Sequence, residues 1–313
     1  MTFAGLTPNM LGALATLFLL LLVASGVLFL LKRRDPQRDF GELELRIRSW
    51  WVMVCIFSAA MLLSRNISLA FFGFISFLAL KEYLSIIPTR RADRRVLFWA
   101  YLAVPLQYYW IGIGWYGLFI IFIPVYMFLF LPLRMVIIGE TRSFLTAAGT
   151  LHWGLMTTVF SISHVAYLLV LPADVNPAAG GAGLVLYLVF LTQSNDISQY
   201  IWGKRFGRNK IIPKVSPNKT WEGFLGGLAT TTLLAMLLAP LLTPLDTKWA
   251  LLAGLIIAAG GFVGDVTISA LKRDIGVKDS GSLLPGHGGI LDRIDSLTYT
   301  APLFFHFVYY LHY

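Results

Sequence analysis

Residues 10–31, MLGALATLFLLLLVASGVLFLL, form an uncharged apolar run that ends at Lys32, Arg33 and Arg34. A helix of that length spans the roughly 30 Å hydrocarbon core of a bilayer. The bases follow the apolar run instead of preceding it, which is the reverse of the order in a cleavable signal peptide. The run therefore predicts a retained membrane anchor whose N-terminus lies outside the cytoplasm.

The composition of the whole chain agrees with a membrane protein. Of its 313 residues, 57% are hydrophobic and 13% are charged, and the mean hydropathy is +0.73. Soluble proteins carry roughly a quarter charged residues. The single cysteine, Cys55, excludes an intrachain disulfide and a thiolate metal cluster, so a bound metal would be a hard ion held by oxygen.

Apolar runs between charged or Pro/Gly-rich breaks predict an all-α polytopic membrane protein with about ten transmembrane helices. The run 144–171 is long enough to be tilted or broken, and Pro124 and Pro132 interrupt 115–133. We expect one membrane domain over 1–313, with scaffold helices in 1–180 and a catalytic half in 181–313. The predicted spans are 10–31, 50–63, 67–87, 96–112, 115–133, 144–171, 181–202, 224–242, 249–268 and 297–312.

Basic residues set the orientation of these spans. Of the 25 Lys and Arg residues, only Arg65 and Lys248 fall outside the five loops on one side. The positive-inside rule places those loops in the cytoplasm and both termini in the periplasm, as in a multi-pass protein of the inner membrane. The first two loops carry mainly bases, which topology and anionic lipids explain. The five loops are 32–48, 81–95, 134–142, 203–223 and 269–296.

The loop 203–223 and the span before it mix acids, bases, Gly and Pro. Asp196, Tyr200 and Gly203 follow helical spacing and would share one face at the cytoplasmic end of a span. The turn from Ser216 to Thr220 precedes a predicted helix start, where free N–H groups favour an anion such as phosphate.

The segment 264–296 is denser still in groups that carry chemistry. Asp265, Ser269 and Lys272 stand at i, i+4 and i+7, so they would line one stripe of a helix. The turn PGHGG at 285–289 would offer exposed N–H groups to phosphate, and Asp292 and Asp295 recur at helical spacing. Carboxylates for a divalent ion beside bases for phosphate are what nucleotidyl transfer at a membrane surface needs.

These two segments together closely resemble the signature of phosphatidate cytidylyltransferases, over about the last 120 residues. The resemblance implies an all-helical membrane enzyme that joins CTP to phosphatidic acid and releases pyrophosphate and CDP-diacylglycerol. It implies Mg²⁺, with a second cation left open, and an active site that faces the cytoplasm. The matching pattern is S-x2-KR-x4-KD from Ser269, PGHGG-x2-DR-x-D from Pro285, D-x3-Y-x2-G-x2-FG from Asp196, and SP-x-KT-x-EG from Ser216.

The family's functional residues map onto matching positions of this chain. The resemblance implies metal ligands at Asp265 and Asp292, and with less weight at Asp196 and Asp295. It implies catalytic roles for Asp265, Ser269, Lys272, Arg273 and Lys219. It implies substrate contacts by Ser216, Lys278, Asp279, His287, Gly288, Gly289, Arg293 and Tyr200. The chain departs from the family at Ile268, where Glu is common, and at Gln199, where a small residue is common.

Two other functions stay open from the sequence. A CTP-dependent lipid-alcohol kinase of the polyprenol type would also bring CTP to a lipid, but it would release CDP. A transporter would use intramembrane acids such as Glu82 and Asp265, although Glu82 beside Lys81 is expected to form a pair at the interface. The expected partners are CTP, phosphatidic acid and membrane lipids, without nucleic acid, and a homodimer is left open.

Overall fold

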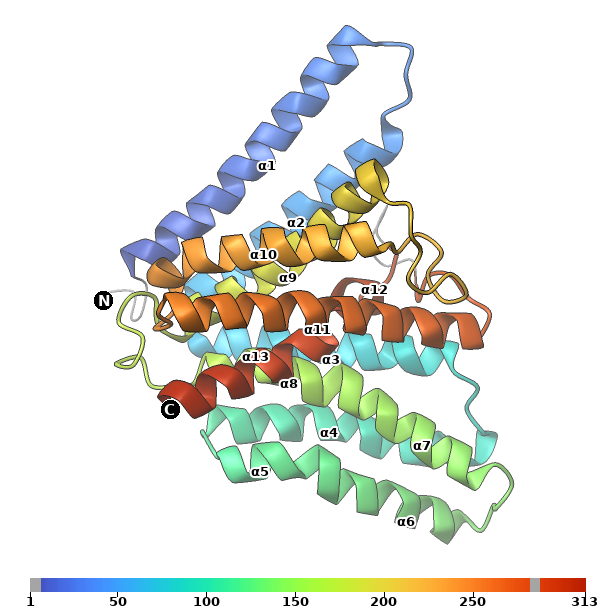
Figure 1. Cartoon of the computed structure of the whole chain (residues 1–313). Helices are drawn as coiled ribbons and strands as arrows, with labels where there is room; N and C mark the ends of the chain where they lie inside the picture. Colours follow the sequence, from blue (N-terminus) through green and yellow to red (C-terminus); the bar gives the residue numbers. More distant parts are fainter. Residues whose placement is uncertain (1–6, 282–287) are drawn as a thin grey trace.

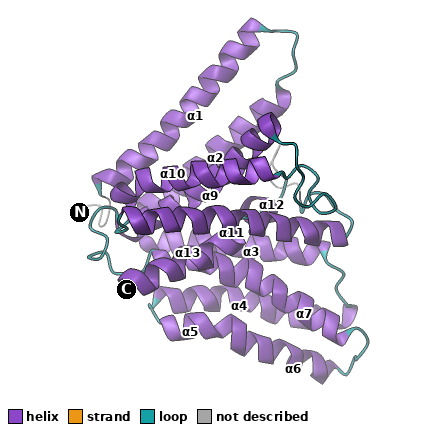
Figure 2. Cartoon of the chain, in the orientation of Figure 1, coloured by secondary structure: helices purple, strands orange, loops and turns teal. Residues whose placement is uncertain are grey.

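The computed structural model describes residues 7–281 and 288–313. Within these ranges the chain folds into helices joined by loops, and Figure 2 draws no strand among them. The helices are α1 (Pro8–Arg34), α2 (Gly41–Leu63), α3 (Arg65–Ile86), α4 (Arg94–Gly112), α5 (Tyr116–Ile121), α6 (Phe128–Ile138), α7 (Phe144–Leu155), α8 (Ser161–Leu168), α9 (Gly180–Phe206), α10 (Trp221–Leu242), α11 (Thr247–Asp274), α12 (Leu291–Ile294) and α13 (Leu297–His312).

Each predicted span coincides with a helix or with a continuous rod of helical segments. The π-helical segment Phe122–Met127 joins α5 to α6, and the π-helical segment Met156–Phe160 joins α7 to α8. The run 144–171 is therefore one rod with a wider turn in its middle, and Pro132 does not end the rod that reaches Ile138. Six helices in the described residues are long and apolar enough to cross a membrane. The chain is a multi-pass membrane protein, and the count of ten crossings stays a prediction.

The loops gather at two ends of the bundle (Figure 1). The start of α1 and the end of α13 lie at one end, and the α9–α10 connection and the end of α11 lie at the other. The α1–α2, α3–α4 and α6–α7 connections reach that second end too, so the predicted basic loops share one end of the bundle. Helix α1 slants away from the other helices, and most of its side chains are exposed, as expected of a surface that faces lipid.

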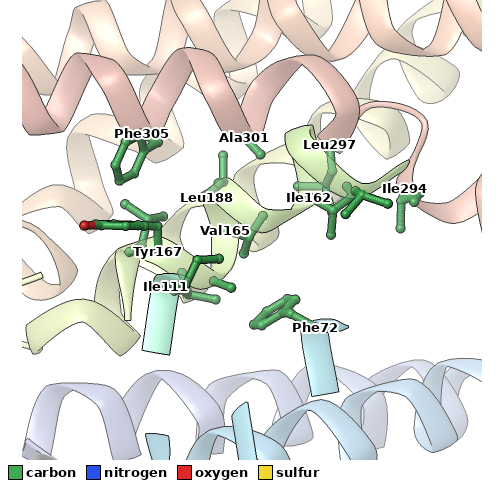
Figure 3. Packing of buried hydrophobic residues seen from close by; sticks show 14 of the residues in the cluster. Phe72, Ile111, Ile162, Val165, Tyr167, Leu188, Ile294, Leu297, Ala301 and Phe305 are labelled. Atoms are coloured by element: carbon green, nitrogen blue, oxygen red, sulfur yellow. The ribbon is translucent and has the colours of Figure 1, made fainter. Parts of the chain in front are cut away.

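The core lies where α8, α9 and α13 meet. Val165, Leu188 and Ala301 come from these three helices and are fully buried, and Figure 3 shows them packed together. Phe72 of α3 approaches the same cluster, so the first half of the chain packs directly on the second.

Small and polar residues bring α9, α10 and α11 close together. A Cβ on Gly264 of α11 would lie 2.5 Å from the carbonyl oxygen of Asp295, so only glycine allows this approach. The amide of Asn195 in α9 donates to the carbonyl of Ala258 at 3.2 Å and accepts from the Thr231 hydroxyl at 3.2 Å. Such polar cross-links are typical of helix contacts in membranes. They fix the helix ends that carry the acidic and basic side chains.

Candidate active site

Acidic side chains from three helical segments line a pocket of about 250 Å³ at the loop end of the bundle. Within it, acids outnumber bases. We call it the carboxylate pocket. Its lining residues are Gln193, Asp196, Asp265, Lys272, Asp279, Asp292, Arg293 and Asp295.

Helix α11 supplies the stripe that the sequence predicts. The Ser269 hydroxyl donates to Asp265 Oδ1 at 3.2 Å, as residues four apart on a helix can do. Lys272 lies one turn further on and points to Asp292. Lys272 and Arg273 stand in the last turn, where basic side chains complement the helix dipole. The helical stripe of Asp265, Ser269 and Lys272 is confirmed.

Asp292 is held by donors on both of its oxygens. Lys272 Nζ lies 2.7 Å from Oδ1, and the amides of Ser280 and Gly289 donate to Oδ2 at 2.9 and 3.0 Å. Burial alone would raise the pKa of Asp292, but Lys272 and these amides hold it below its ordinary value. Asp292 therefore links Lys272 of α11 to Ser280 and Gly289, which lie on either side of the loop between α11 and α12.

Asp196 and Asp295 face the same pocket with fewer donors. Among the described residues, only Ser296 donates to them, through its hydroxyl to Asp196 at 3.0 Å and through its amide to Asp295 at 2.7 Å. Partial burial raises the pKa of Asp295 well above its ordinary value, and the charges of Asp265 and Asp196 raise it further. This side of the pocket holds negative charge that the chain leaves largely unbalanced.

A second pocket, of about 500 Å³, opens beside the first and is basic. Lys219 Nζ lies 2.6 Å from Asp265 Oδ2 and 2.9 Å from Gln199 Oε1, so it stands between the two pockets. Thr220 begins α10 by accepting the Gly223 amide, as the predicted helix start requires, and thereby fixes Lys219. We call this the lysine pocket. It is lined by Asp196, Gln199, Tyr200, Gly203, Lys204, Lys210, Ser216, Asn218, Lys219, Thr220, Gly223, Phe224 and Asp265.

A third pocket, of about 380 Å³, is lined almost entirely by apolar side chains of α1, α2, α3, α8 and α9, such as Leu17, Phe71 and Phe190. Its polar residues are Gln193 and Arg293, which also line the carboxylate pocket. Arg293 Nε is buried and has no hydrogen-bond partner among the described residues. The apolar pocket thus meets the carboxylate pocket at an arginine with an unused donor.

Several predicted site residues lie elsewhere. Arg273 is exposed, and its guanidinium donates to the carbonyls of Val215 and Val277 at 3.3 and 3.4 Å, so it ties two loops together. Lys278 is exposed and does not line any of the three pockets described here. Tyr200 and Ser216 line the lysine pocket, and Asp279 lines the carboxylate pocket. His287 lies outside the described residues.

The expectation of free N–H groups in the glycine-rich turn is wrong at Gly289, its last residue. Gly289 N donates to Asp292, and the next two amides, of Ile290 and Leu291, donate to Glu82. Gly288 has φ +80°, and a Cβ there would meet Asp292 Oδ2 at 2.6 Å. These glycines therefore make room for carboxylates of the protein itself.

The sequence interpretation also missed residues of the site. Gln193 lines two of the pockets, and its place three residues before Asp196 on the same helix would have indicated it. Lys204 and Lys210 line the lysine pocket but were counted only as topology signals. Glu82 does not simply pair with Lys81 at an interface, because its carboxylate accepts two amides from residues more than 200 positions away.

The carboxylate pocket suits a hard divalent cation in its chemistry. Carboxylate oxygens are the donors that Mg²⁺ prefers, and Asp196 and Asp295 have few other partners. In the described ranges, however, no three acidic, histidine or cysteine side chains converge into a ready-made coordination sphere. Asp292 fits a ligand role less well than Asp196 and Asp295, since both its oxygens already accept hydrogen bonds. Asp265 also has a partner on each oxygen, Ser269 and Lys219, so it would bind a cation only if Lys219 moved to another anion.

Comparison with known proteins now adds to this geometry. Residues 44–311 match the model of the cytidylyltransferase family. The chain is 51% identical to the uncharacterized protein YnbB of Escherichia coli K12, over 95% of this chain and 98% of that protein. It is 41% identical to the phosphatidate cytidylyltransferase of Haemophilus influenzae over 42% of this chain and 47% of that protein. It is 46% identical to the phosphatidate cytidylyltransferase of Pseudomonas aeruginosa over 39% of this chain and 46% of that protein. The chain therefore spans about half the length of these two enzymes.

Proposed function

Because the chain belongs to the cytidylyltransferase family, we propose that it transfers the cytidylyl group of CTP to phosphatidic acid and releases pyrophosphate and CDP-diacylglycerol. The observation that carries the proposal is the order of the three pockets. The apolar pocket meets the carboxylate pocket at Gln193 and Arg293, and the carboxylate pocket meets the lysine pocket at Asp196 and Asp265. That order matches a lipid tail, a reacting centre and a nucleotide.

The lipid is expected to bind at the first of these junctions. Acyl chains fit the apolar pocket, and the phosphate of phosphatidic acid would meet Arg293, whose buried Nε lacks an acceptor within residues 7–281 and 288–313. A guanidinium binds a phosphate through paired N–H donors. Arg293 is then the residue that brings the lipid phosphate to the carboxylate pocket.

The nucleotide is expected to bind at the second junction. Lys204, Lys210 and Lys219 line the lysine pocket, and their charges would offset those of a triphosphate. Lys219 is the nearest of the three to the reacting centre, because its ammonium already lies against Asp265. We infer that a phosphate of CTP competes with Asp265 for this ammonium and frees a carboxylate oxygen.

The chemistry needs charge balance more than proton transfer. The phosphate of the lipid is already an anionic nucleophile, and its oxygen would attack the α phosphorus of CTP while the bond to pyrophosphate breaks. Arg293 and Lys219 would hold the two anions against their mutual repulsion. A divalent cation, if held by Asp196, Asp265 and Asp295, would supply positive charge to the phosphate oxygens. Mg²⁺ is our expected cation, and we place the site at the cytoplasmic face of the inner membrane, where CTP is available.

Purified protein incubated with phosphatidic acid, labelled CTP and Mg²⁺ tests this function. We expect CDP-diacylglycerol and an equal amount of pyrophosphate, both abolished by EDTA. A lipid alcohol offered in place of phosphatidic acid should give no product. CDP together with a phosphorylated lipid would instead establish a kinase. If no lipid gives a product, a protein without this enzymatic activity would be favoured.

A further inference from the structure

Glu82 of α3, in the first half of the chain, contacts the segments on both sides of the loop between α11 and α12. We propose that Glu82 is a positioning residue, which holds the two arms of the loop between α11 and α12 in place and thereby holds Asp292 against Lys272. Ser280 and Gly281 form the first arm, and Gly289 to Leu291 form the second. This inference deepens the proposed function and rests on it for its effect on turnover.

Hydrogen bonds from both arms converge on the Glu82 carboxylate. Ile290 N donates to Oε2 at 2.9 Å and Leu291 N donates to Oε1 at 3.0 Å. The hydroxyl of Ser280, which is buried, also donates to Oε1. A carboxylate with three donors is held far more firmly than a surface charge. Among the described residues, Glu82 and Asp292 are therefore the two carboxylates that join these arms.

Asp292 is the other carboxylate between the same arms. It accepts the amide of Ser280 from the first arm and the amide of Gly289 from the second. The two carboxylates thus share Ser280, one through its hydroxyl and the other through its amide. In the part of the chain that the structure describes, loss of Glu82 would leave Asp292 as the one carboxylate link, with its side chain free to move relative to Lys272.

Glycine packing gives independent support. A Cβ added to Gly289 would lie 1.9 Å from Glu82 Oε1, and its three nearest atoms all belong to the Glu82 carboxylate. The three atoms nearest to a Cβ on Gly281 likewise all belong to Glu82, the first at 3.0 Å. The space beside these two glycines is filled by Glu82. An alanine at 289 is therefore expected to be tolerated only when the carboxylate is absent.

Four variants test the inference: Glu82→Ala, Glu82→Gln, Gly289→Ala and the double variant Glu82→Ala/Gly289→Ala. Lys81→Gln is the matched control, because Lys81 is the neighbouring, exposed residue of the same helix. Glu82→Gln keeps the shape of the side chain and one acceptor oxygen. It therefore keeps the test open if Glu82→Ala does not fold.

Hydrogen exchange of the detergent-solubilised protein gives a readout that does not depend on activity. We expect the amides of Ile290 and Leu291 to exchange about tenfold faster or more in Glu82→Ala, with a smaller increase in Glu82→Gln. Lys81→Gln should exchange like the wild type. Unchanged protection of both amides in the Glu82 variants would overturn the inference, whatever the protein catalyses.

Turnover of CTP and phosphatidic acid gives the second readout. Glu82→Ala should lower kcat by about 10- to 100-fold and raise the Mg²⁺ concentration for half-maximal rate, with a smaller change in KM for CTP. Gly289→Ala should lower kcat by at least about tenfold in the wild-type chain but by less than about threefold in the Glu82→Ala background. If the loss of kcat in the double variant equals the combined losses of the two single variants, Glu82 and Gly289 act separately, which contradicts the inference. A wild type without turnover would refute the proposed function and leave hydrogen exchange to decide this one.

Discussion

The carboxylate of Asp292 in α12 is balanced by its partners, whereas the carboxylates of Asp196 in α9 and of Asp295, between α12 and α13, are not. Asp292 accepts from Lys272 and from two amides, and its pKa lies below the ordinary value. Asp295 is only three residues away, receives one amide, and has a raised pKa because it is desolvated by burial and because Asp265 and Asp196 repel its charge. A carboxylate with full partners stabilises the fold, while one held near like charges is available to a ligand.

Asp265→Asn should have the largest effect and should act on turnover. Its carboxylate belongs to both polar pockets and pairs with Lys219, so the neutral amide removes charge from the reacting centre. We expect kcat to fall by about 100-fold or more, with little loss of stability. Initial rates and size-exclusion chromatography in detergent check both parts. A variant with near-normal turnover would remove Asp265 from the reaction.

Asp292→Asn should instead act mainly on stability. The side chains of Lys272 and Asp292 are only 12% and 5% exposed, so the variant leaves a buried ammonium without its partner. The free energy of unfolding should fall by about 2–4 kcal/mol at neutral pH. Because the folded-state pKa of Asp292 is lowered, its contribution is present above the ordinary carboxyl pKa and is lost as pH falls through the folded value. Thermal unfolding at several pH values measures this, and an unchanged unfolding temperature would contradict it.

Asp295→Asn should raise the free energy of unfolding, whereas Asp292→Asn lowers it. We expect this rise in protein stripped of metal by EDTA. The raised pKa means that the ionised carboxyl costs folding free energy, and the amide removes this cost while its oxygen can still accept the Ser296 amide. We expect a gain on the order of 1 kcal/mol at neutral pH, seen as a rise of about 2 °C in Tm. The gain should vanish at acidic pH, where Asp295 is protonated in both states. A lower Tm at neutral pH would show that the charge of Asp295 is balanced by its partners, as the charge of Asp292 is.

Lys278→Gln should have the smallest effect. The residue matches the family pattern but is exposed and does not line any of the three pockets described here. We expect kcat/KM to change by less than about twofold, as for most exposed substitutions. The same assay with Arg293→Gln, which removes a residue shared by two pockets, provides the contrast. A large loss in Lys278→Gln would show that substrate draws this lysine inward.

Features that depend on neighbouring residues could be predicted from the sequence. Apolar runs located the helices, and helical spacing placed Asp265, Ser269 and Lys272 on one stripe of α11. The turn at 216–220 predicted that a helix starts after it, and α10 begins at Trp221 with Thr220 as its N-cap. These features follow from periodicity and capping, which act over a few residues.

Features that depend on how distant helices pack could not be predicted. Nothing near Glu82 indicates that its partners lie at 280, 290 and 291. Likewise, the helical spacing of Asp292 and Asp295 did not indicate that Asp292 would pack against Lys272 while Asp295 would meet Ser296. Packing between separate elements decides which polar group meets which, and it leaves no local pattern.

The fit of Gly289 against the Glu82 carboxylate has an evolutionary consequence. A lineage that lost the acidic group at 82 would be released from the demand for glycine at 289, whereas a lineage that first gained a side chain at 289 would have to give up the carboxylate. The two positions, 207 residues apart in the chain, should therefore change together or not at all. In an alignment of many relatives they would stand out as a covarying pair between the two halves of the protein.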